Sequence, residues 1–482
     1  MKKLFFILSI TGILSLASCE LDLDPWQALS DETVFTKIED YENGVRGIYA
    51  ELFDYGAYGG ALFIYPDVVA DNLIQCRNGR LTLSEMQTWT WASDDGVPET
   101  VWEEFYDALN NCNLLIASLE NFNVSSADQA LKDHLLGEAY TLRALFHYEL
   151  VKVYGKAYSQ AASGDLGVPY MKKSAVSEPT RETVISNYDN IMADLTKALP
   201  LVTINNGRFR ISPAAVNGIL AQVSLEMGQY NDAVTYATAS LNLVSICPLA
   251  NFTNIWNDTE GRGGVFYVQV TEQDRDDAAA RVTLGTNYSQ TGATGTKSEY
   301  VCDYELYQLY TADDIRLTAY FRTSTFNGVS YNHIWKYKQK SGAVTPDMVD
   351  LKVLRAEEIL LTRAEAYYRL GGANETNALA DLNTLRAQRY TGFVAGTESG
   401  SALLDAILLQ RRLELAFEGD RLQTLKRLGL GISRNGTYGD VSDGTGATYT
   451  VTDLAAGNFR FELPIPLSEM NSNPSMVQNP GY

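Results

Sequence analysis

Aromatic, amide and acidic side chains gather in a stretch of the chain that shows little helical or strand periodicity. Trp89 and Trp91 stand two residues apart, so an extended segment would point both rings to the same side. Asp71, Asn72 and Gln75 precede them. Flat rings stack on the apolar C–H faces of sugars, while carboxylate and amide groups bond the hydroxyls. The stretch is therefore a predicted glycan site, with the alternative that both tryptophans pack the loop onto the core.

Two smaller groups offer the same chemistry. Tyr288 stands beside Asn287 and close to Gln290 in a segment rich in glycine and threonine, and Tyr55 and Tyr58 lie in a glycine-rich turn. Each group combines an aromatic face with nearby polar side chains or exposed backbone, and loops of this kind often carry binding residues. We include both groups, and Tyr58 in particular, among the predicted ligand contacts.

A lipid attachment site is predicted at the start of the chain. Lys2 and Lys3 precede the apolar run 4–16, and Ala17-Ser18 stand directly before Cys19. A positive start, a short apolar run and small residues are the parts of a secretory signal, and the run is too short to span a bilayer. A cysteine in this place resembles a bacterial lipobox, which implies cleavage before Cys19 and lipidation of it. The alternative is an ordinary signal with an incidental cysteine.

Residues for catalysis or metal binding are not arranged in any motif that we can identify. His134, His147 and His333 are scattered, and the four cysteines after Cys19 show no paired spacing typical of zinc sites. No nucleophile elbow or dinucleotide-binding motif is present, so no cofactor is predicted. Carboxylates are numerous, and a pair of them could serve a glycosidase only at the right separation, which a sequence does not reveal.

Composition limits the partners. The 482 residues carry a formal net charge of −21, and removal of Lys2 and Lys3 with the signal makes the chain more acidic still. Such a surface repels phosphate backbones, so nucleic-acid binding is not expected. Cys76, Cys112, Cys247 and Cys302 could form disulfides after export or remain buried thiols, and the sequence leaves both possibilities open.

The elements that must hold these residues are mostly helices. Helical periodicity predicts helices over 31–53, 101–121, 127–154 and 182–199. The segment 213–243 matches a tetratricopeptide repeat, with Pro213 in the first turn, Gly228 and Tyr230 at the turn and a small Ala233 between the helices. The same pattern returns over 356–389. The fold class is therefore mainly α, a tetratricopeptide-repeat-like helical scaffold.

The periodicity also divides the chain. Residues 1–18 are the predicted signal peptide, 19–30 an acidic tether, and 31–482 one helical domain. Three stretches interrupt that domain as loop-rich insertions, over about 56–100, 251–347 and 431–461. The middle insertion is predicted to contain a strand over 265–270, and within the first, residues 67–98 are expected to form a surface loop.

Long segments of the chain resemble the SusD/RagB family of Bacteroidota outer-membrane lipoproteins. They are GEAYTLRALFHYELVKVYG (137–155), VLRAEEILLTRAEAYYRLG (353–371), ALADLNTLRAQR (378–389), ILLQRRLELAFEGDRLQTLKRLG (407–429) and FELPIPLSEMNSNPSMVQNPGY (461–482). The resemblance covers essentially the whole chain after Cys19. One departure is at Gln423 and Thr424, where the family usually carries a bulky aromatic pair.

The resemblance implies a helical fold of four tetratricopeptide-type units that support an irregular face. It implies a place on the outer face of the outer membrane, and a SusC-like TonB-dependent transporter as partner, which the chain would cap as a lid. It implies capture of oligosaccharide without catalysis, or of peptides as in RagB-type relatives. Ligand residues of the family lie in variable loops, so none is transferred to this sequence. A surface glycoside hydrolase and a pure protein adaptor remain alternatives.

Overall fold

The structure is a computed structural model, and it describes residues 35–76, 82–271, 284–288, 299–326, 329–337, 340–343, 348–434 and 451–482. The predicted signal peptide 1–18, the lipidation site Cys19 and the tether 19–30 lie outside the described residues. Most of the predicted insertion 431–461 also lies outside them. The signal peptide, the lipidation of Cys19 and the tether therefore remain predictions.

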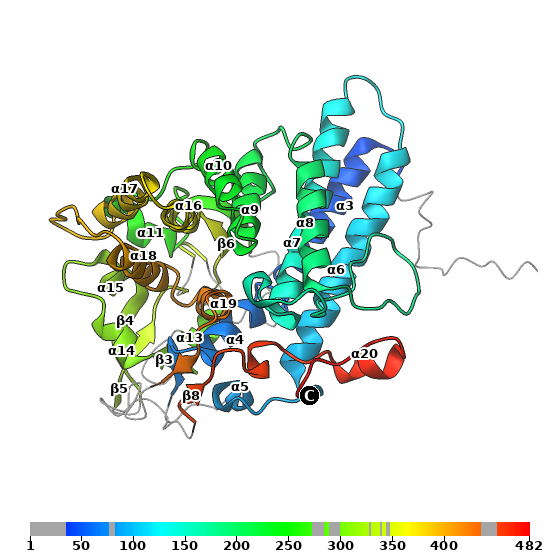
Figure 1. Ribbon diagram of the computed structural model, residues 1–482. Helices are drawn as coiled ribbons and strands as arrows, with labels where there is room; N and C mark the ends of the chain where they lie inside the picture. The colour runs from blue at the N-terminus through cyan, green and yellow to red at the C-terminus, as the bar shows by residue number, and fades with distance from the viewer. Residues whose placement is uncertain are drawn as a thin grey trace, which may run out of the picture.

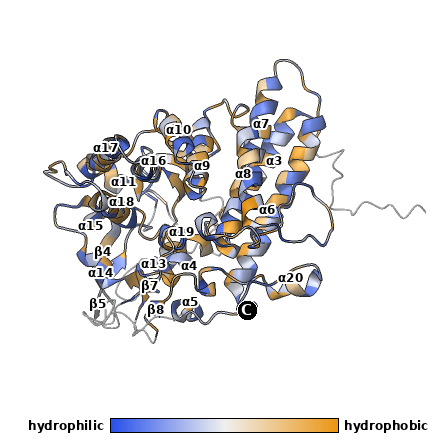
Figure 2. Ribbon diagram, viewed as in Figure 1, coloured by the Kyte–Doolittle hydropathy of each residue, from blue (hydrophilic) through white to orange (hydrophobic). Residues whose placement is uncertain are grey.

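Four long helices form one flank of the molecule, at the right of Figure 1: α3 (Ile38–Glu51), α6 (Gly96–Asn121), α7 (Gln129–Tyr154) and α8 (Val184–Ala198). α7 is central because it packs against both α6 and α8, and its residues from 134 to 151 are all buried. α3 instead buries one stripe, with Tyr41, Val45 and Ile48 facing inward. Figure 2 shows hydrophobic and hydrophilic residues on different sides of these helices. The four predicted helices are confirmed, and α6 begins five residues earlier than predicted.

Paired helices form the second part of the fold: α9 (Pro213–Glu226) with α10 (Tyr230–Leu241), α16 (Ala356–Leu370) with α17 (Asn374–Ala387), and α18 (Ser401–Glu414) with the short α19 (Asp420–Arg427). α10 packs against α16, so successive pairs stack on one another as repeats do. We call these six helices the helical frame. The predicted fold class, a tetratricopeptide-repeat-like scaffold, is confirmed.

Local sequence signals explain where these helices begin and turn. The Ser212 hydroxyl accepts a hydrogen bond from the Ala215 amide and so caps α9. Gly228 makes the turn with φ +71°, a conformation that suits glycine. Ala233 is fully buried between α9 and α10, and its small side chain lets the two helices approach closely. Ser212, Gly228 and Ala233 thus have in the structure the cap, turn and packing roles that the tetratricopeptide-type prediction for 213–243 gave them.

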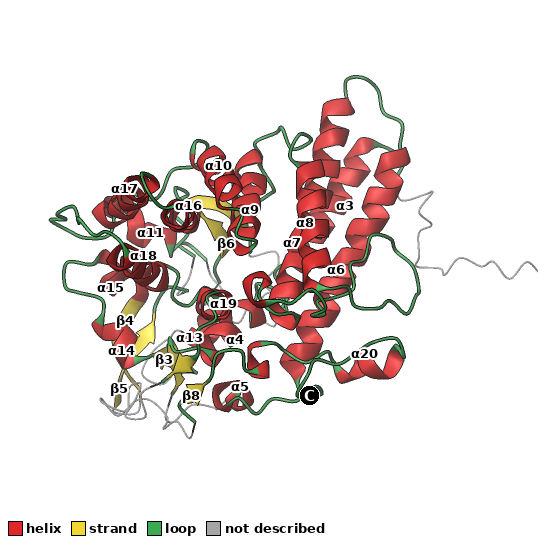
Figure 3. Ribbon diagram, viewed as in Figure 1, coloured by secondary structure: helices red, strands yellow, loops and turns green. Residues whose placement is uncertain are grey.

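The strands and the short helices fill the space between the helix pairs. β2 (Gly264–Val268) confirms the strand predicted over 265–270, and it pairs antiparallel with β6 (Leu351–Arg355). A second sheet has the strand order β1-β3-β5-β4, from β1 (Leu73–Gln75), β3 (Tyr300–Cys302), β5 (Val329–Ile334) and β4 (Phe321–Phe326). The remaining elements are α4 (Ala61–Val69), α5 (Ser84–Thr88), η1 (Tyr158–Gln160), η2 (Leu249–Asn251), α11 (Phe252–Ile255), α13 (Leu284–Tyr288), α14 (Tyr304–Gln308), α15 (Ile315–Tyr320), β7 (Ile432–Ser433), β8 (Asp453–Leu454), η5 (Phe459–Phe461) and α20 (Leu467–Ser472). Figure 3 shows these elements joined by long loops on the lower side.

The prediction of a surface loop over 67–98 is wrong. Its first part belongs to α4, a helix whose nine residues are all buried, and the chain continues through β1 and α5 into the start of α6. A helix that is apolar on every side has no period of 3.6 residues, so the pattern that reveals amphipathic helices does not reveal this one. The described part of the segment thus consists of short helices and a strand, with buried residues in α4 and β1 and exposed ones such as Thr82, Thr90 and Asp94.

A cluster of buried charges joins the helical frame to the inserted strands and helices. Glu414, at the end of α18, accepts hydrogen bonds from Arg389 (2.8 and 2.9 Å), Arg355 (3.0 Å) and Arg316 (3.3 Å). All four side chains are fully buried or nearly so. Burial alone would raise the pKa of Glu414, but the three guanidinium groups lower it below the ordinary range. The conspicuous segment LELAFEGD is therefore a structural junction, as its scaffold role in the resemblance implies.

The glycine that follows this junction is required by its surroundings. Gly419 has φ +76°, and a Cβ atom there would collide with the carbonyl oxygen of Leu62 in α4. Its amide donates a hydrogen bond of 2.9 Å to Asp67 of the same helix. The turn before α19 is thus held against α4, and the two halves of the chain meet there.

The cysteines in the described part of the chain, Cys76, Cys112, Cys247 and Cys302, are free and buried. Burial raises the pKa of the Cys112 thiol above its usual range and that of Cys247 to about 12. Of the two possibilities that the sequence left open, the structure shows buried thiols. Within the described residues no helix has the length and hydropathy needed to cross a membrane.

Candidate functional site

The two tryptophans of the first predicted site are packed in the core. Trp89 is 6% exposed, its indole N–H donates to the Val69 carbonyl (3.0 Å), and the Arg434 guanidinium lies over its ring at 4.2 Å. Trp91 is 1% exposed, with Arg460 at 5.0 Å from its ring centre. Neither indole offers a face to a ligand in this structure. The geometry favours the alternative that both rings pack their loop onto the core.

The polar residues predicted to accompany them also have internal partners. Asp71 forms ion pairs with Arg421 (2.7 Å) and Arg412 (3.3 Å). Asn72 is 1% exposed, donates to Asp67 (2.9 Å) and accepts from Arg412 (2.9 Å). These side chains join α4 to α18 and α19, and their hydrogen-bonding groups are used in doing so.

Gln75 has a similar place. It is 5% exposed on β1, and its amide donates to the Thr82 carbonyl (2.7 Å). A buried polar group needs such a partner, because leaving it unpaired costs about 1–3 kcal/mol. Gln75 therefore closes the gap between β1 and the start of α5 instead of reaching solvent.

The tyrosine groups are likewise internal. Tyr288 is fully buried, stacks at 5.7 Å on Tyr337 and donates to the Phe63 carbonyl (3.4 Å). The carbonyl of its neighbour Asn287 accepts from the Glu299 amide, so the short helix α13 is fixed to the strand region. Gln290 lies outside the described residues. The structure does not bring Tyr288 and Trp89 to one open surface, and a ligand role for either remains only a prediction.

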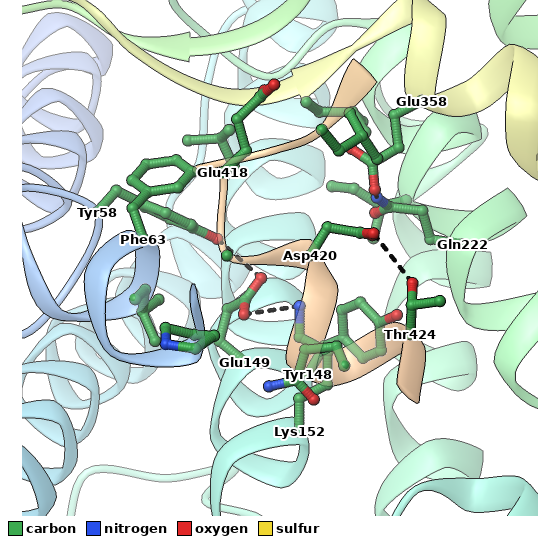
Figure 4. Close-up of a pocket in the computed structure, with 18 of the residues that line it drawn as sticks. Tyr58, Phe63, Tyr148, Glu149, Lys152, Gln222, Glu358, Glu418, Asp420 and Thr424 are labelled. Carbon is green, nitrogen blue, oxygen red and sulfur yellow. Dashed lines mark hydrogen bonds and ion pairs between the residues drawn. The ribbon is translucent and has the colours of Figure 1, made fainter. Parts of the chain in front are cut away.

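Tyr58 lines a cavity, whereas Tyr55, which is partly buried, does not line it. The cavity holds about 1030 Å³ of empty space, its open mouth included, and lies between α4, α7, α9, α16 and α19. Figure 4 shows the charged side chains that face it. Gln423 and Thr424, the two positions that depart from the resembling family's pattern, also line it.

The charged groups of this cavity are paired with one another. Glu149 contacts Lys152 at 2.8 Å and accepts from the Tyr58 hydroxyl at 3.0 Å (Figure 4). Glu358 accepts from Gln222 (2.6 Å) and Arg411 (3.2 Å). A neutral sugar that entered would have to displace these pairs without replacing their charges.

Asp420 is also paired. It accepts one hydrogen bond from Arg411 (2.9 Å) and another from the Thr424 hydroxyl (3.0 Å). Burial raises the pKa of Glu358 to about 7, while Arg411 opposes the rise. Several carboxylates thus face one cavity, the arrangement that a hydrolase would need, but each accepts hydrogen bonds from its neighbours. We therefore interpret the cavity as a charge-paired junction and look for the binding site elsewhere.

An open polar and aromatic patch lies on the β4–β5 hairpin, which Figure 1 places at the lower left. Trp335 follows β5 and is half-buried, whereas the other four tryptophans of the described residues are no more than 6% exposed. The exposed Arg322 of β4 places its guanidinium over the Trp335 ring at 4.6 Å. Thr323 and Asn332, joined by a hydrogen bond of 2.6 Å, are the next pair along the strands and therefore point to the opposite face of the hairpin. We call Arg322 and Trp335 the Trp335 patch.

The backbone and a buried histidine hold the patch in place. The Trp335 amide donates to the Tyr320 carbonyl at 2.6 Å. His333 is fully buried, with its ring 5.8 Å from that of Trp335 in an edge-on arrangement. Burial and the nearby Arg322 lower the pKa of His333 to about 4, so the ring is neutral at pH 7. The patch therefore presents a supported aromatic ring and a cation on one face of the hairpin.

Sequence reasoning missed this patch, although Trp335 stands in the insertion that was predicted to be loop-rich. The alternation of apolar and polar residues at the start of VSYNHIW, a segment that ends on a tryptophan, was the available signal. No group of three or more histidine, cysteine or acidic side chains suited to a metal ion occurs within the described ranges.

A helical scaffold of paired repeats with an open aromatic patch on an inserted hairpin defines a class of binding proteins, and comparison with known proteins identifies the family. A sequence model described as the SusD family matches residues 227–482, and a second, described as starch-binding and associating with the outer membrane, matches residues 21–225. The chain belongs to the SusD family.

Relatives along the chain agree. The SusD-like protein P2 of Formosa agariphila is 26% identical over 537 aligned positions, which cover 100% of both chains. The starch-binding protein SusD of Bacteroides thetaiotaomicron is 32% identical over 145 residues, 30% of this chain and 24% of that protein. The family is one of binding proteins, and this points to binding rather than catalysis.

Solved structures share the fold. A SusD superfamily protein from Bacteroides thetaiotaomicron superposes with a TM-score of 0.81 at 22% identity, covering 92% of this chain and 100% of that one. A SusD-like carbohydrate binding protein from Bacteroides vulgatus gives a TM-score of 0.77 at 20% identity, covering 92% and 98%. At these identities the likeness shows the fold alone.

Proposed function

We propose that this protein binds glycans at the cell surface, captures oligosaccharides and delivers them to a SusC-like TonB-dependent transporter as its lid. The observation that carries the proposal is the Trp335 patch, where a half-buried indole stands beside the exposed guanidinium of Arg322. Membership of the SusD family and the starch-binding relative support a sugar as ligand. The absence of an unpaired carboxylate dyad in the central cavity supports binding without turnover in the described part of the chain.

The chemistry of the patch suits a neutral sugar. An indole face covers the C–H groups of a pyranose ring, and loss of one such contact is worth about 0.5–1.5 kcal/mol beyond the buried area. Arg322 brings guanidinium donors to the indole, where hydroxyls of a stacked sugar ring would lie. A peptide could use the same indole, but it would also need a partner for its backbone groups.

The test is titration calorimetry with malto-oligosaccharides, other neutral oligosaccharides and matched peptides. Trp335→Ala is expected to lower the affinity for the bound glycan by about tenfold or more, with the thermal unfolding of the protein little changed. Trp91→Phe is the matched control, because it keeps a ring in the core and leaves the patch intact.

Three results would contradict the proposal. Binding of peptides and of no oligosaccharide would replace it with the RagB-like alternative. Loss of glycan binding in Trp91→Phe, with Trp335→Ala unaffected, would move the site to the stretch that the sequence first suggested. Turnover of any oligosaccharide by the purified protein would favour the hydrolase alternative.

The lid role requires attachment to the outer membrane, and the lipobox-like Cys19 is the predicted anchor. Several acyl chains hold a protein durably, because each buried CH₂ contributes about 0.8 kcal/mol. Cys19→Ala is expected to leave the protein folded and unlipidated in the soluble fraction. Fractionation of cells that express both forms checks this, and membrane retention of Cys19→Ala would contradict the anchor.

A further inference from the structure

A second pocket lies on the helical side, away from the Trp335 patch. It is formed by the segment before α9, the loop after α10 and the start of β2, and holds about 850 Å³, its open mouth included. Figure 1 shows α9 and α10 at the top of the molecule and the β4–β5 hairpin at the lower left. A ligand in this pocket would not touch the patch.

The charge of this pocket is opposite to that of the chain. The protein has 59 acidic and 38 basic side chains, yet the pocket is lined by Arg208 and Arg262 and by no aspartate or glutamate. The first turn of α9, with Pro213 and Ala214, adds the partial positive charge of a helix N-terminus. In so acidic a protein, a pocket with this lining can attract an anion.

Arg208 has no acidic partner among the described residues. Its guanidinium lies over the rings of Phe209 (4.5 Å) and Tyr267 (5.7 Å), and its Nε atom is buried without a hydrogen-bond acceptor. Arg210, two residues further on, shows the usual alternative, since it donates to Glu138 (3.0 Å) and Glu42 (2.8 Å). A buried donor without an acceptor is costly, so Arg208 is the group that a ligand would satisfy.

Two glycines make room for this side chain. A Cβ atom on Gly264 would lie 2.7 Å from Cδ of Arg208, and one on Gly261 would collide with its Nη1 atom. The absence of both side chains lets the guanidinium lie against the wall of the pocket. The position of Arg208 is therefore built by the surrounding backbone and is not one of many rotamers of a free surface arginine.

We propose that this pocket binds the carboxylate of a small soluble molecule, with the Arg208 guanidinium as its anchor. A planar guanidinium matches a carboxylate with two parallel N–H donors. A dianionic phosphate would call for a second unpaired cation, but Arg262 is already neutralised by Glu260. One available positive charge fits one carboxylate.

The remaining lining indicates the rest of the ligand. Asn205 and Ser245 are exposed polar side chains at the pocket, while Leu243, Val244 and Val265 are apolar. A uronic acid fits this combination, because it joins a carboxylate to hydroxyls and to an apolar ring face. The site is independent of the proposed glycan capture at the Trp335 patch.

The test is calorimetric titration of the full chain with glucuronate and galacturonate, with glucose and inorganic phosphate as comparison probes. Saturable binding of a uronate that weakens as salt rises is expected, and neither glucose nor phosphate should match it. Arg208→Gln is expected to weaken the uronate affinity by about tenfold or more, because it removes a charge-assisted pair of hydrogen bonds.

Two further variants distinguish loss of a specific binding site from a general effect of the protein's net charge. Gly261→Ala keeps every charge but displaces the guanidinium, so it should also weaken uronate binding. Arg46→Gln removes an exposed arginine elsewhere and should have no effect. Absence of saturable uronate binding, or binding that Arg208→Gln leaves unchanged, overturns the proposal. Trp335→Ala should retain uronate binding, so failure here is distinguishable from failure of the proposed function.

Discussion

The helical frame and the β4–β5 hairpin surround their charged side chains in opposite ways. In the frame, Glu414 is closed in by Arg316, Arg355 and Arg389, and no part of it reaches solvent. On the hairpin, Arg322 is exposed and rests on the half-buried Trp335. A closed set of charges fixes the elements that supply them, whereas an open set can exchange water for a ligand. The conspicuous sequence motifs belong to the first kind, and the proposed glycan site to the second.

The largest effect that separates the two regions is expected at Glu414. Glu414→Gln leaves three buried guanidinium groups without their common counter-charge, and breaking a buried pair in this way costs about 3–5 kcal/mol. Urea unfolding measures the loss, with the exposed Glu103→Gln as a control of equal charge change. A Glu414→Gln protein as stable as wild type would remove the distinction between closed and open charge clusters.

The junction between the frame and α4 provides a second test. Gly419→Ala forces a side chain into a left-handed conformation and against the Leu62 carbonyl, with an expected cost of about 1–3 kcal/mol or more. Gly457 also has a positive φ (+71°) but an open surrounding, so Gly457→Ala isolates the conformational part of the cost. Equal losses in the two variants would show that the contact with α4 contributes nothing.

The hairpin should show the reverse behaviour. Arg322→Ala removes an exposed cation, so the free energy of unfolding should change by no more than about 0.5 kcal/mol. Glycan affinity should fall several-fold, because the donors at the rim of the sugar and the support of the Trp335 ring are lost together. Calorimetry beside thermal unfolding checks both, and a loss of stability without a loss of affinity would assign Arg322 to the scaffold.

A separate test of the frame concerns pH dependence. Burial raises the pKa of Glu358 from 4.5 to about 7, so between these values the folded protein holds a proton that the unfolded chain has lost. Its contribution to stability therefore falls as pH rises from about 4.5 to 7. Glu358→Gln should flatten the stability profile in that window, as urea unfolding at several pH values would show. An unchanged profile would mean that Glu358 titrates normally.

Residue types and spacing predicted the parts of the fold that depend on residues close together in the chain. Ser212, Gly228 and Ala233 act within one helix pair, so their types and spacing were enough to identify the repeat. α4 could not be identified in the same way, because part of its burial comes from α19, which lies near the other end of the chain.

The candidate site illustrates the same limit. Trp89 and Trp335 stand in comparable polar surroundings in the sequence, yet one is packed against Val69 and Arg434 while the other remains half-buried. The exposure of each ring depends on which element covers it, and the residues next to each tryptophan in the sequence do not indicate that element. The position of a tryptophan in the chain indicates its chemistry but not its accessibility.

The four buried thiols have a consequence for biogenesis. A thiolate is the reactive form of cysteine, and the raised pKa values at Cys112 and Cys247 keep these two groups protonated. Because the four described cysteines form no disulfide with one another, folding need not wait for an oxidoreductase to form bonds between them. The same chain produced in a reducing cytoplasm should reach the same fold, with packing alone shielding its sulfur atoms from oxidants.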